Sequence, residues 1–139
     1  ERVVGVDREQ AMLDAAAQRC ADLHNVELVR ASLDDLPLPS ASIDAALCML
    51  VLHHPALVRP VLAEARRVLR PGGRLVILDM VEHDREDYRQ TMGHHHLGFS
   101  EDTVRGLREE VGFTRVRWRR LPASPAARGP GLFVAVGVV

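Results

Sequence analysis

The sequence lacks the marks of several protein classes. Its 139 residues include 18 Lys and Arg against 19 Asp and Glu, a formal net charge of −1 at pH 7. That balance gives no electrostatic reason to bind nucleic acid. The longest apolar runs, such as residues 45–52, are far shorter than the roughly 20 residues that span a bilayer. We therefore expect one globular unit over residues 1–139, with no membrane contact.

Cysteine is scarce as well. Cys20 and Cys48 form no spacing motif, and both lie in apolar patterns. This favours free, buried thiols in a reducing cytoplasm. No secretory signal is expected, because the chain opens on a charged Glu-Arg pair. A strand pattern begins at once, with no lead-in, which suggests a fragment of a longer protein.

What is present is an alternation of short apolar runs and segments with a period near 3.6. The runs predict strands at residues 2–6, 26–31, 43–50, 74–80, 114–121 and 132–139. The periodic segments predict helices at residues 8–23, 56–69 and 101–111, the last capped by Ser100. Residues 81–99 are polar, rich in histidine and without a clear period.

This order predicts an α/β protein with a doubly wound, mostly parallel sheet. The last two strands, joined by the Pro- and Gly-rich turn at residues 122–131, predict an antiparallel hairpin at one edge. The nearly continuous apolar character of residues 43–50 is typical of a strand covered on both faces. Pro71, Gly72 and Gly73 are expected to end the preceding helix.

Three strings carry a family resemblance: VVGVDREQAML from residue 3, ASLDDLPLPSASIDAAL from residue 31 and LRPGGRLVILDM from residue 69. Together with the strand order they resemble the class I S-adenosylmethionine-dependent methyltransferases. The resemblance covers essentially the whole chain and implies a Rossmann-like fold that lacks its first strand and helix. It implies S-adenosylmethionine as the cofactor. The glycine-rich loop of the family, which approaches the methionine moiety, would lie before residue 1.

The resemblance also implies the cofactor-binding residues. Asp7 ends the first visible strand, where the family's acidic residue accepts hydrogen bonds from both ribose hydroxyls. Arg8 would flank this site through its backbone. Ser32 and Leu33 would lie beside the adenine, Ser32 through its hydroxyl and Leu33 through its backbone N–H. Relatives often carry Asp at the position of Ser32, and a hydroxyl is the weaker acceptor.

The end of the third visible strand supplies further candidates. Cys48 and Met49 are expected opposite the cofactor, with packing in the core as the alternative. His53 follows directly and is the candidate catalytic residue, because a side chain with a pKa near neutrality can orient an acceptor or take its proton. His53 could instead cap the coming helix.

Two groups of neighbouring polar residues resemble a metal site and a carboxylate pair, but neither pattern requires such a function. His94, His95 and His96 are adjacent, so their side chains diverge on any regular backbone, and no Cys or carboxylate lies at ligand spacing. We therefore expect no metal site, and a place in a lid over the acceptor is the preferred interpretation. The paired carboxylates of Asp34 and Asp35 are interpreted as a solvated loop.

The expected activity is transfer of a methyl group from S-adenosylmethionine to an unidentified small-molecule acceptor. The alternative is a noncatalytic domain that senses S-adenosylmethionine or S-adenosylhomocysteine, because residues 83–113 resemble methyltransferase domains that follow an ArsR-type winged-helix domain. DNA would then be bound only by an upstream domain, and a homodimer is left open. A nicotinamide-dependent oxidoreductase is disfavoured by the string PGGRLVILDM and the closing hairpin.

Overall fold

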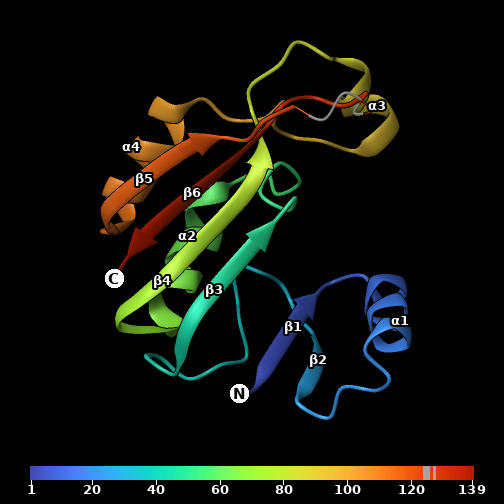
Figure 1. Ribbon diagram of the computed structural model, residues 1–139, viewed down its shortest axis with the longest axis vertical. Helices are drawn as coiled ribbons and strands as arrows, with labels where there is room; N and C mark the ends of the chain where they lie inside the picture. The colour runs from blue at the N-terminus through green and yellow to red at the C-terminus, as the bar shows by residue number, and fades with distance from the viewer. Residues whose placement is uncertain (124–125, 127) are drawn as a thin grey trace.

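The computed structural model describes residues 1–123, 126 and 128–139. Their elements, drawn in Figure 1, are β1 (Val3–Asp7), α1 (Gln10–Arg19), β2 (Val26–Arg30), β3 (Ile43–Met49), α2 (Val58–Val68), β4 (Leu69–Met80), α3 (Asp87–Met92), α4 (Glu101–Val111), β5 (Thr114–Arg120) and β6 (Leu132–Val138). No helix among them is long and apolar enough to cross a membrane.

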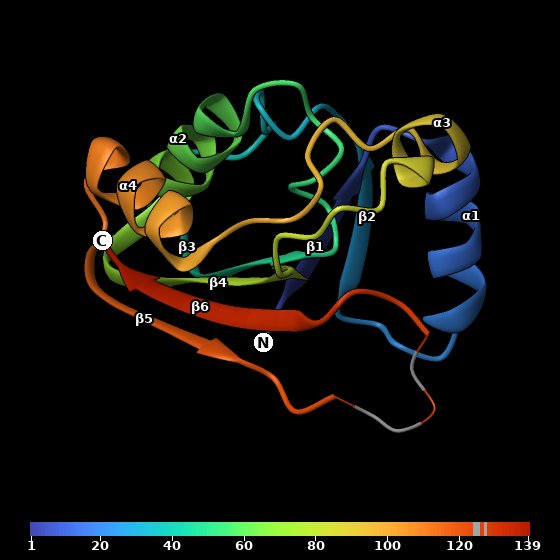
Figure 2. The same ribbon diagram turned by 90° about the horizontal axis from the view of Figure 1, so that it is seen from above.

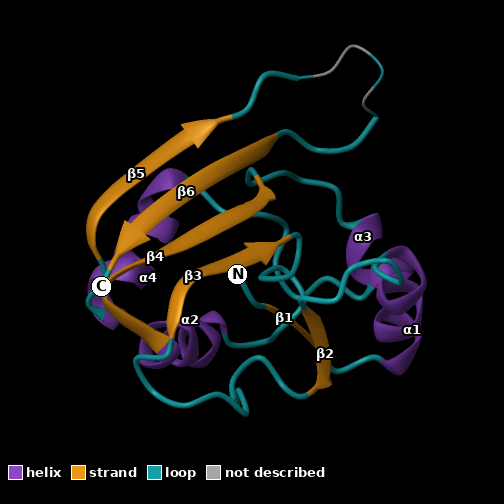
Figure 3. Cartoon of the chain, turned by 60° about the horizontal axis from the view of Figure 1, so that its bottom comes forward, coloured by secondary structure: helices purple, strands orange, loops and turns teal. Residues whose placement is uncertain are grey.

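The strands form two sheets. β1 and β2 pair in parallel, and a four-stranded sheet has the order β3-β4-β6-β5 (Figure 3). β3 and β4 are parallel, whereas β6 runs antiparallel to both β4 and β5. The predicted α/β class and closing hairpin are confirmed. Part of the predicted turn, at residues 124, 125 and 127, lies outside the described residues.

No hydrogen-bonded pairing joins β1 to β3, so the described strands leave one edge of each of them unpaired. Within the described chain β1 pairs only with β2, and β3 only with β4. Helices α2 and α4 cover one face of the four-stranded sheet (Figure 2), and Leu47 and Met49 on β3 remain 62% and 57% exposed. The expectation that this strand is covered on both faces is therefore wrong for the described residues, because no element packs over those side chains.

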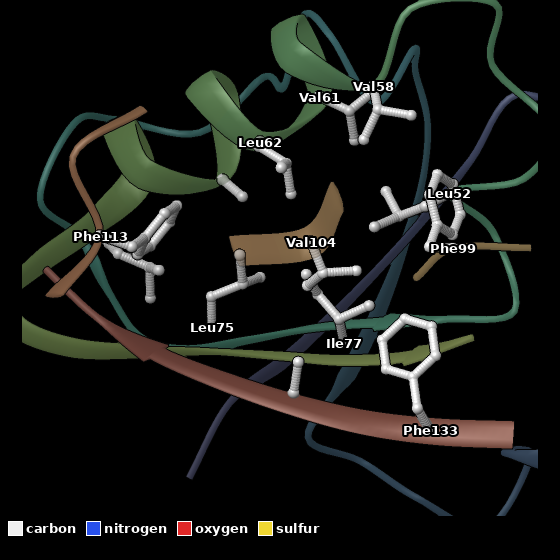
Figure 4. Close-up of a cluster of buried hydrophobic side chains, with 13 residues drawn as sticks. Leu52, Val58, Val61, Leu62, Leu75, Ile77, Phe99, Val104, Phe113 and Phe133 are labelled. Atoms are coloured by element: carbon white, nitrogen blue, oxygen red, sulfur yellow. The ribbon is translucent and has the colours of Figure 1, made fainter. Parts of the chain in front are cut away.

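The core lies between the four-stranded sheet and α2. The apolar residues of α2 recur every three or four positions, which places them on one face. That face buries Val58, Val61, Leu62, Ala65 and Val68. They meet side chains of β4 and β6, including Leu75, Ile77 and Phe133, as Figure 4 shows. Pro60 is accommodated because it lies in the first turn of the helix.

The junction between α2 and β4 differs from the prediction. The helix ends at Val68, and the strand begins directly at Leu69 and runs through Pro71, Gly72 and Gly73. Gly72 has a φ of +80°, which favours glycine, and Gly73 allows close approach of the backbone. The N–H of Gly72 donates to the carbonyl of Val139 at 3.0 Å, and a Cβ on Gly73 would lie 2.8 Å from the carbonyl oxygen of Arg70.

The segment after β4 is more ordered than its sequence suggests. It contains the short helix α3, which no periodicity predicts, and returns to the end of β4. The N–H of Phe99 donates to the carbonyl of Met80 at 2.9 Å, and the N–H of His83 to that of Leu97 at 3.0 Å. Gly98 makes this return possible: its φ is +76°, and a Cβ there would lie 2.4 Å from the carbonyl oxygen of Val81.

Helix α4 follows as predicted. It begins at Glu101, and the hydroxyl of Ser100 accepts the N–H of Thr103 at 3.1 Å. This is the expected N-cap bond, which satisfies one of the free donors of the first turn. Gly112, with φ of +90°, ends the helix.

Candidate active site

The candidate site lies at the carboxyl ends of the parallel strands. In Figure 1 the arrows of β1, β3 and β4 end toward the same side of the molecule, and the segment with α3 lies beyond them. Ligands of open α/β sheets bind at this end, because the loops that follow the strands converge there. The residues predicted for the site lie on the loops and strand ends of this side.

A histidine and a carboxylate form the buried centre of the site. Nδ1 of His53 lies 2.7 Å from Oδ1 of Asp79, and their side chains are 5% and 0% exposed. The carboxylate also accepts the backbone N–H of Leu52 on Oδ2 at 3.0 Å and that of Met80 on Oδ1 at 2.8 Å. Because these bonds fix Asp79, it holds the His53 ring in one orientation and leaves Nε2 for other partners.

The turn that carries His53 is strained and well anchored. Leu50, directly after β3, has a φ of +52°, which is unfavourable for a side chain with a Cβ. Its N–H donates to the carbonyl of Leu78 at 2.7 Å, which ties the turn to β4. Such strain persists only where the surroundings enforce it, and it is commonly found at functional sites.

Two further imidazoles pack against His53. The ring of His54 lies 4.2 Å from that of His53, and the ring of His94 also lies 4.2 Å from it, centroid to centroid. His94 reaches the site from the end of α3. The backbone N–H groups of His95 and His96 donate to the carbonyl of His53, at 3.0 and 3.1 Å, and so hold the segment in place.

The environment favours neutral rings at two of these positions. Burial lowers the pKa of His94, and the nearby His53 and His54 lower it further. Burial also lowers the pKa of His54, with contributions from His53 and Arg8, while Asp79 opposes the shift.

The end of β1 carries the predicted ribose ligand. Asp7 is half-buried, and its Oδ1 accepts the N–H of Glu9 at 2.8 Å. Its backbone carbonyl accepts the N–H of Ala31 at 3.1 Å, which places the loop after β2 beside it. Arg8 is exposed, and its carbonyl accepts Nε of Arg30 at 3.0 Å. A half-buried carboxylate with one anchored oxygen suits a partner that carries hydroxyl donors.

Ser32 and Leu33 lie on that neighbouring loop. The exposed hydroxyl of Ser32 donates to Oδ1 of Asp34, so its lone pairs are left to accept from an amine. Asp34 is therefore engaged with Ser32, whereas Asp35 uses its backbone N–H to bond the carbonyl of Ser32 at 3.2 Å. The side chain of Leu33 packs against the hydrophobic core, so only its backbone is available to a ligand.

Cys48 and Met49 point to different surroundings. Cys48 packs against the core, and burial, reinforced by the charge of Asp79, raises the pKa of its thiol to about 11. This side chain therefore follows the packing alternative. Met49 is 57% exposed at the open edge of β3. Adjacent strand residues face opposite sides of a sheet, so the two do not act together.

A cleft of about 740 Å³ lies beside residues 95–99. Its walls come from the start of α2, from α4 and from residues 95–99, and they include Leu57, Arg59, His83, His96 and Phe99. Nε2 of His83 and Nε2 of His96 are buried there without a hydrogen-bond partner in the described structure. The cleft is not lined by Asp7 or Ser32, so it is separate from the predicted cofactor residues.

A candidate site residue that the sequence did not single out is Asp79. Its signal is a carboxylate within the apolar run LVILDM, where an ionised group is unfavourable unless it is paired. The partner, His53, is 26 residues away in the sequence. Pairing across that separation follows from the parallel alignment of β3 and β4, which brings Met49 level with Leu78.

Comparison with known proteins identifies the class. Residues 1–77 match the family model described as "Methyltransferase domain", and this chain belongs to that family. The solved structure of an S-adenosylmethionine-dependent methyltransferase from Mesorhizobium loti superposes with a TM-score of 0.78 at 21% identity, covering 99% of this chain and 80% of that one. The fold is thus that of the class I methyltransferases.

Relatives with higher identity match over a shorter stretch. An uncharacterized 37.1 kDa protein in transposon TN4556 of Streptomyces fradiae is 49% identical over 76 residues, which cover 55% of this chain and 22% of that protein. The demethylmenaquinone methyltransferase of Tropheryma whipplei is 39% identical over 77 residues, which cover 55% of this chain and 32% of that protein. The chain thus matches less than a third of the length of either relative.

Proposed function

We propose that the protein transfers a methyl group from S-adenosylmethionine to a small-molecule acceptor, with His53 as the residue that receives the acceptor's proton. The observation that carries this proposal is the buried Asp79–His53 pair at the carboxyl ends of β3 and β4, in a chain of the methyltransferase domain family. The predicted ribose ligand Asp7 and the adenine neighbour Ser32 lie at the adjoining ends of β1 and β2, and their free acceptor atoms fit an adenosine moiety.

Different residues of the chain would bind the cofactor and accept the proton. Bound S-adenosylmethionine supplies an electrophilic methyl group, so the protein needs to provide proximity, orientation and a proton acceptor. Asp7, Ser32 and the backbone of Leu33 hold the nucleoside. Asp79 keeps Nδ1 of His53 occupied, so Nε2 takes the proton that the acceptor loses. The imidazolium that results is stabilised by the Asp79 carboxylate.

The cleft does not set the acceptor class, because it is lined by neither His53 nor Asp7. We infer a hydroxylated ring compound, in which loss of the hydroxyl proton to His53 makes the ring a better nucleophile. The name of the Tropheryma whipplei relative, a demethylmenaquinone methyltransferase, supports an acceptor related to quinones.

The active unit would be longer than this chain. The unpaired inner edges of β1 and β3 and the exposed Leu47 and Met49 support a further strand between the two sheets. We therefore place the activity in a longer protein, in which upstream residues complete the cofactor site.

The test is a transfer assay with the full-length protein. Purified protein is mixed with S-adenosylmethionine labelled in the methyl group and with a reduced naphthoquinone, and S-adenosylhomocysteine and methylated product are quantified together. Stoichiometric formation of both is expected. Tight binding of S-adenosylmethionine without turnover on phenolic, amine or thiol acceptors would overturn catalysis and favour the sensing role.

A further inference from the structure

Three imidazoles from two distant parts of the chain converge at the ends of β3 and β4. One ring nitrogen from each of His53, His54 and His94 lies within 4.8 Å of the corresponding atoms of the other two. Two of these residues follow β3, and the third arrives from the end of α3, about forty positions later. The approach of His94 to the other two is therefore a product of the fold and not of sequence adjacency.

The contacts within the described structure do not provide a hydrogen-bond partner for every ring nitrogen of this cluster. His94 is only 7% exposed, and its Nδ1 has no hydrogen-bond partner among the described residues. A buried polar atom without a partner is unfavourable by about 1–3 kcal/mol, so native structures rarely keep one without a ligand or water. The surroundings of this ring are other rings, those of His53, His54 and Tyr88, at centroid distances of 4.2, 5.1 and 5.3 Å.

Asp79 gives His53 the arrangement of a metal ligand. Histidines that bind metals usually donate their other ring N–H to a carboxylate or carbonyl, which fixes the ring and strengthens the ligating nitrogen. Nδ1 of His53 is 2.7 Å from Oδ1 of Asp79, and Asp79 is itself held by two backbone N–H groups. This leaves Nε2 of His53 as the nitrogen that can face an ion.

We propose that His53, His54 and His94 bind one divalent transition-metal ion, with Zn²⁺ as the best fit and a fourth position left open. Three imidazoles suit zinc, whereas Mg²⁺ and Ca²⁺ prefer oxygen ligands. Zn–N bonds of about 2.0–2.1 Å place the nitrogens of a tetrahedral site about 3.4 Å apart, so nitrogens within 4.8 Å of one another need to approach by up to about 1.4 Å. His54 is half-buried and provides the route of entry.

This differs from the sequence-based expectation of no metal site. That expectation rested on the divergence of adjacent histidines, and of the three only His94 belongs to the cluster. The other two ligands come from His53 and His54, which the sequence offered only as neighbours of a strand end.

The inference stands on geometry and does not depend on methyl transfer. If an ion occupies Nε2 of His53, that nitrogen cannot also serve as a base, and a hydroxyl bound at the open position would be acidified by the ion instead. Metal binding is therefore to be measured without S-adenosylmethionine or acceptor, so that failure of one proposal leaves the other standing.

The experiment is a metal titration of the chelator-treated, dialysed full-length protein. Zn²⁺ affinity is measured by competition with a chromophoric chelator, and Co²⁺ is added separately to detect the visible absorption of a tetrahedral site. One ion per chain is expected. His54→Ala and His94→Ala should each weaken Zn²⁺ binding by about 100-fold or more, since loss of an outer partner alone weakens it by about 10- to 100-fold. His95→Ala is the matched control and should leave the affinity unchanged.

The test remains decisive even if one of the variants does not fold. If His94→Ala does not fold, imidazole NMR signals of the unmodified protein decide the matter: those of three histidines should shift together and saturate at one equivalent of Zn²⁺. The half-buried position of His54 also makes its alanine variant the better tolerated one. Absence of saturable binding, or Zn²⁺ affinity that is the same in His54→Ala as in the unmodified protein, would overturn the proposal.

Discussion

Nδ1 of His53 and Oδ1 of Asp79 lie 2.7 Å apart in a place where neither side chain is more than 5% exposed. The pair joins the loop after β3 to the last residues of β4, and the same carboxylate accepts the N–H groups of Leu52 and Met80. A buried carboxylate is unfavourable unless it is paired in this way. The contact therefore fixes the strand ends and orients the candidate catalytic ring at the same time.

Asp79→Asn removes the charge while it keeps the size of the side chain. An amide can still accept a backbone N–H but stabilises an imidazolium poorly. We expect the turnover number for methyl transfer to fall by about 10²- to 10⁴-fold, the usual contribution of a positioned proton acceptor. The KM for S-adenosylmethionine should stay the same. Steady-state kinetics with both substrates varied separate the two quantities.

The control for that variant is His24→Ala, which alters an exposed histidine in the loop between α1 and β2. Its kinetics should match those of the unmodified protein. Thermal melts of Asp79→Asn are needed beside the kinetics, because a folded variant with full turnover would exclude a role for the pair in proton transfer.

Asp7→Ala tests the nucleoside side of the site. Loss of a charged hydrogen-bonding partner should weaken S-adenosylmethionine binding by about 1–3 kcal/mol. Isothermal titration calorimetry on the full-length protein measures this directly. Asp22→Ala, at an exposed position beyond the end of α1, is the matched control and should bind normally. Equal affinities for the two variants would remove Asp7 from the ribose site.

Local patterns predicted most of the elements. The alternation of apolar runs and 3.6-residue periods places the strands and main helices, because each element buries one face against the same core. Ser100 and Gly112 bound α4 as expected, since caps depend on a few neighbouring residues. The strand predicted from residue 74 begins at Leu69 instead, because the backbone of Gly72 and Gly73 bonds that of the distant Val139.

The sequence predicted the site only in part, because contacts between distant residues leave no local pattern. Asp7 and His53 could be chosen because both follow a strand end, where ligands of this fold class collect. The pairing of His53 with Asp79 depends on the parallel alignment of β3 and β4. The contact of His53 with His94 depends on how the segment after β4 returns along Val81, which no local period encodes. A long-range contact between single polar residues produces no periodic pattern in the sequence.

The two cysteines should differ in reactivity. Burial raises the pKa of Cys48 to about 11, and the thiolate is the species that alkylating agents attack. Iodoacetamide should therefore modify Cys20 well before Cys48 in the folded protein, and modification of Cys48 should accelerate as the pH rises toward 11. Peptide mass mapping over a time course gives both rates. In denaturant the difference should vanish; if it does not, burial is not its cause.

A core substitution tests the packing of α2. Leu62 is 1% exposed, and replacement by Ala should lower the free energy of unfolding by about 2–5 kcal/mol, because it removes apolar contacts and leaves a cavity. Leu57, at the start of the same helix, is 71% exposed, and Leu57→Ala should change that free energy by no more than about 0.5 kcal/mol. Urea unfolding monitored by circular dichroism compares the two. Similar effects would contradict the assigned faces.

The last prediction concerns acid stability and the loop before β3. Oε2 of Glu64 accepts the N–H of Leu36 at 2.9 Å, while Arg67 bonds Oε1 of Glu64 at 2.7 Å and the carbonyls of Leu36 and Leu38 at 2.9 Å each. The hydrogen bond from Arg67 is the main reason that the pKa of Glu64 lies below its ordinary value of 4.5.

A carboxyl group with a lowered pKa in the folded state stabilises the fold above its unfolded pKa, and this contribution is lost as the pH falls through the folded value. The unmodified protein should therefore melt at a higher temperature than Glu64→Gln near neutral pH, and the gap should close in acid below pH 4.5. Glu101→Gln, which breaks an exposed i,i+4 pair with Arg105, should show little difference at any pH. A gap for Glu64→Gln that persists unchanged in acid would mean that the lost stability came from packing and not from the charge.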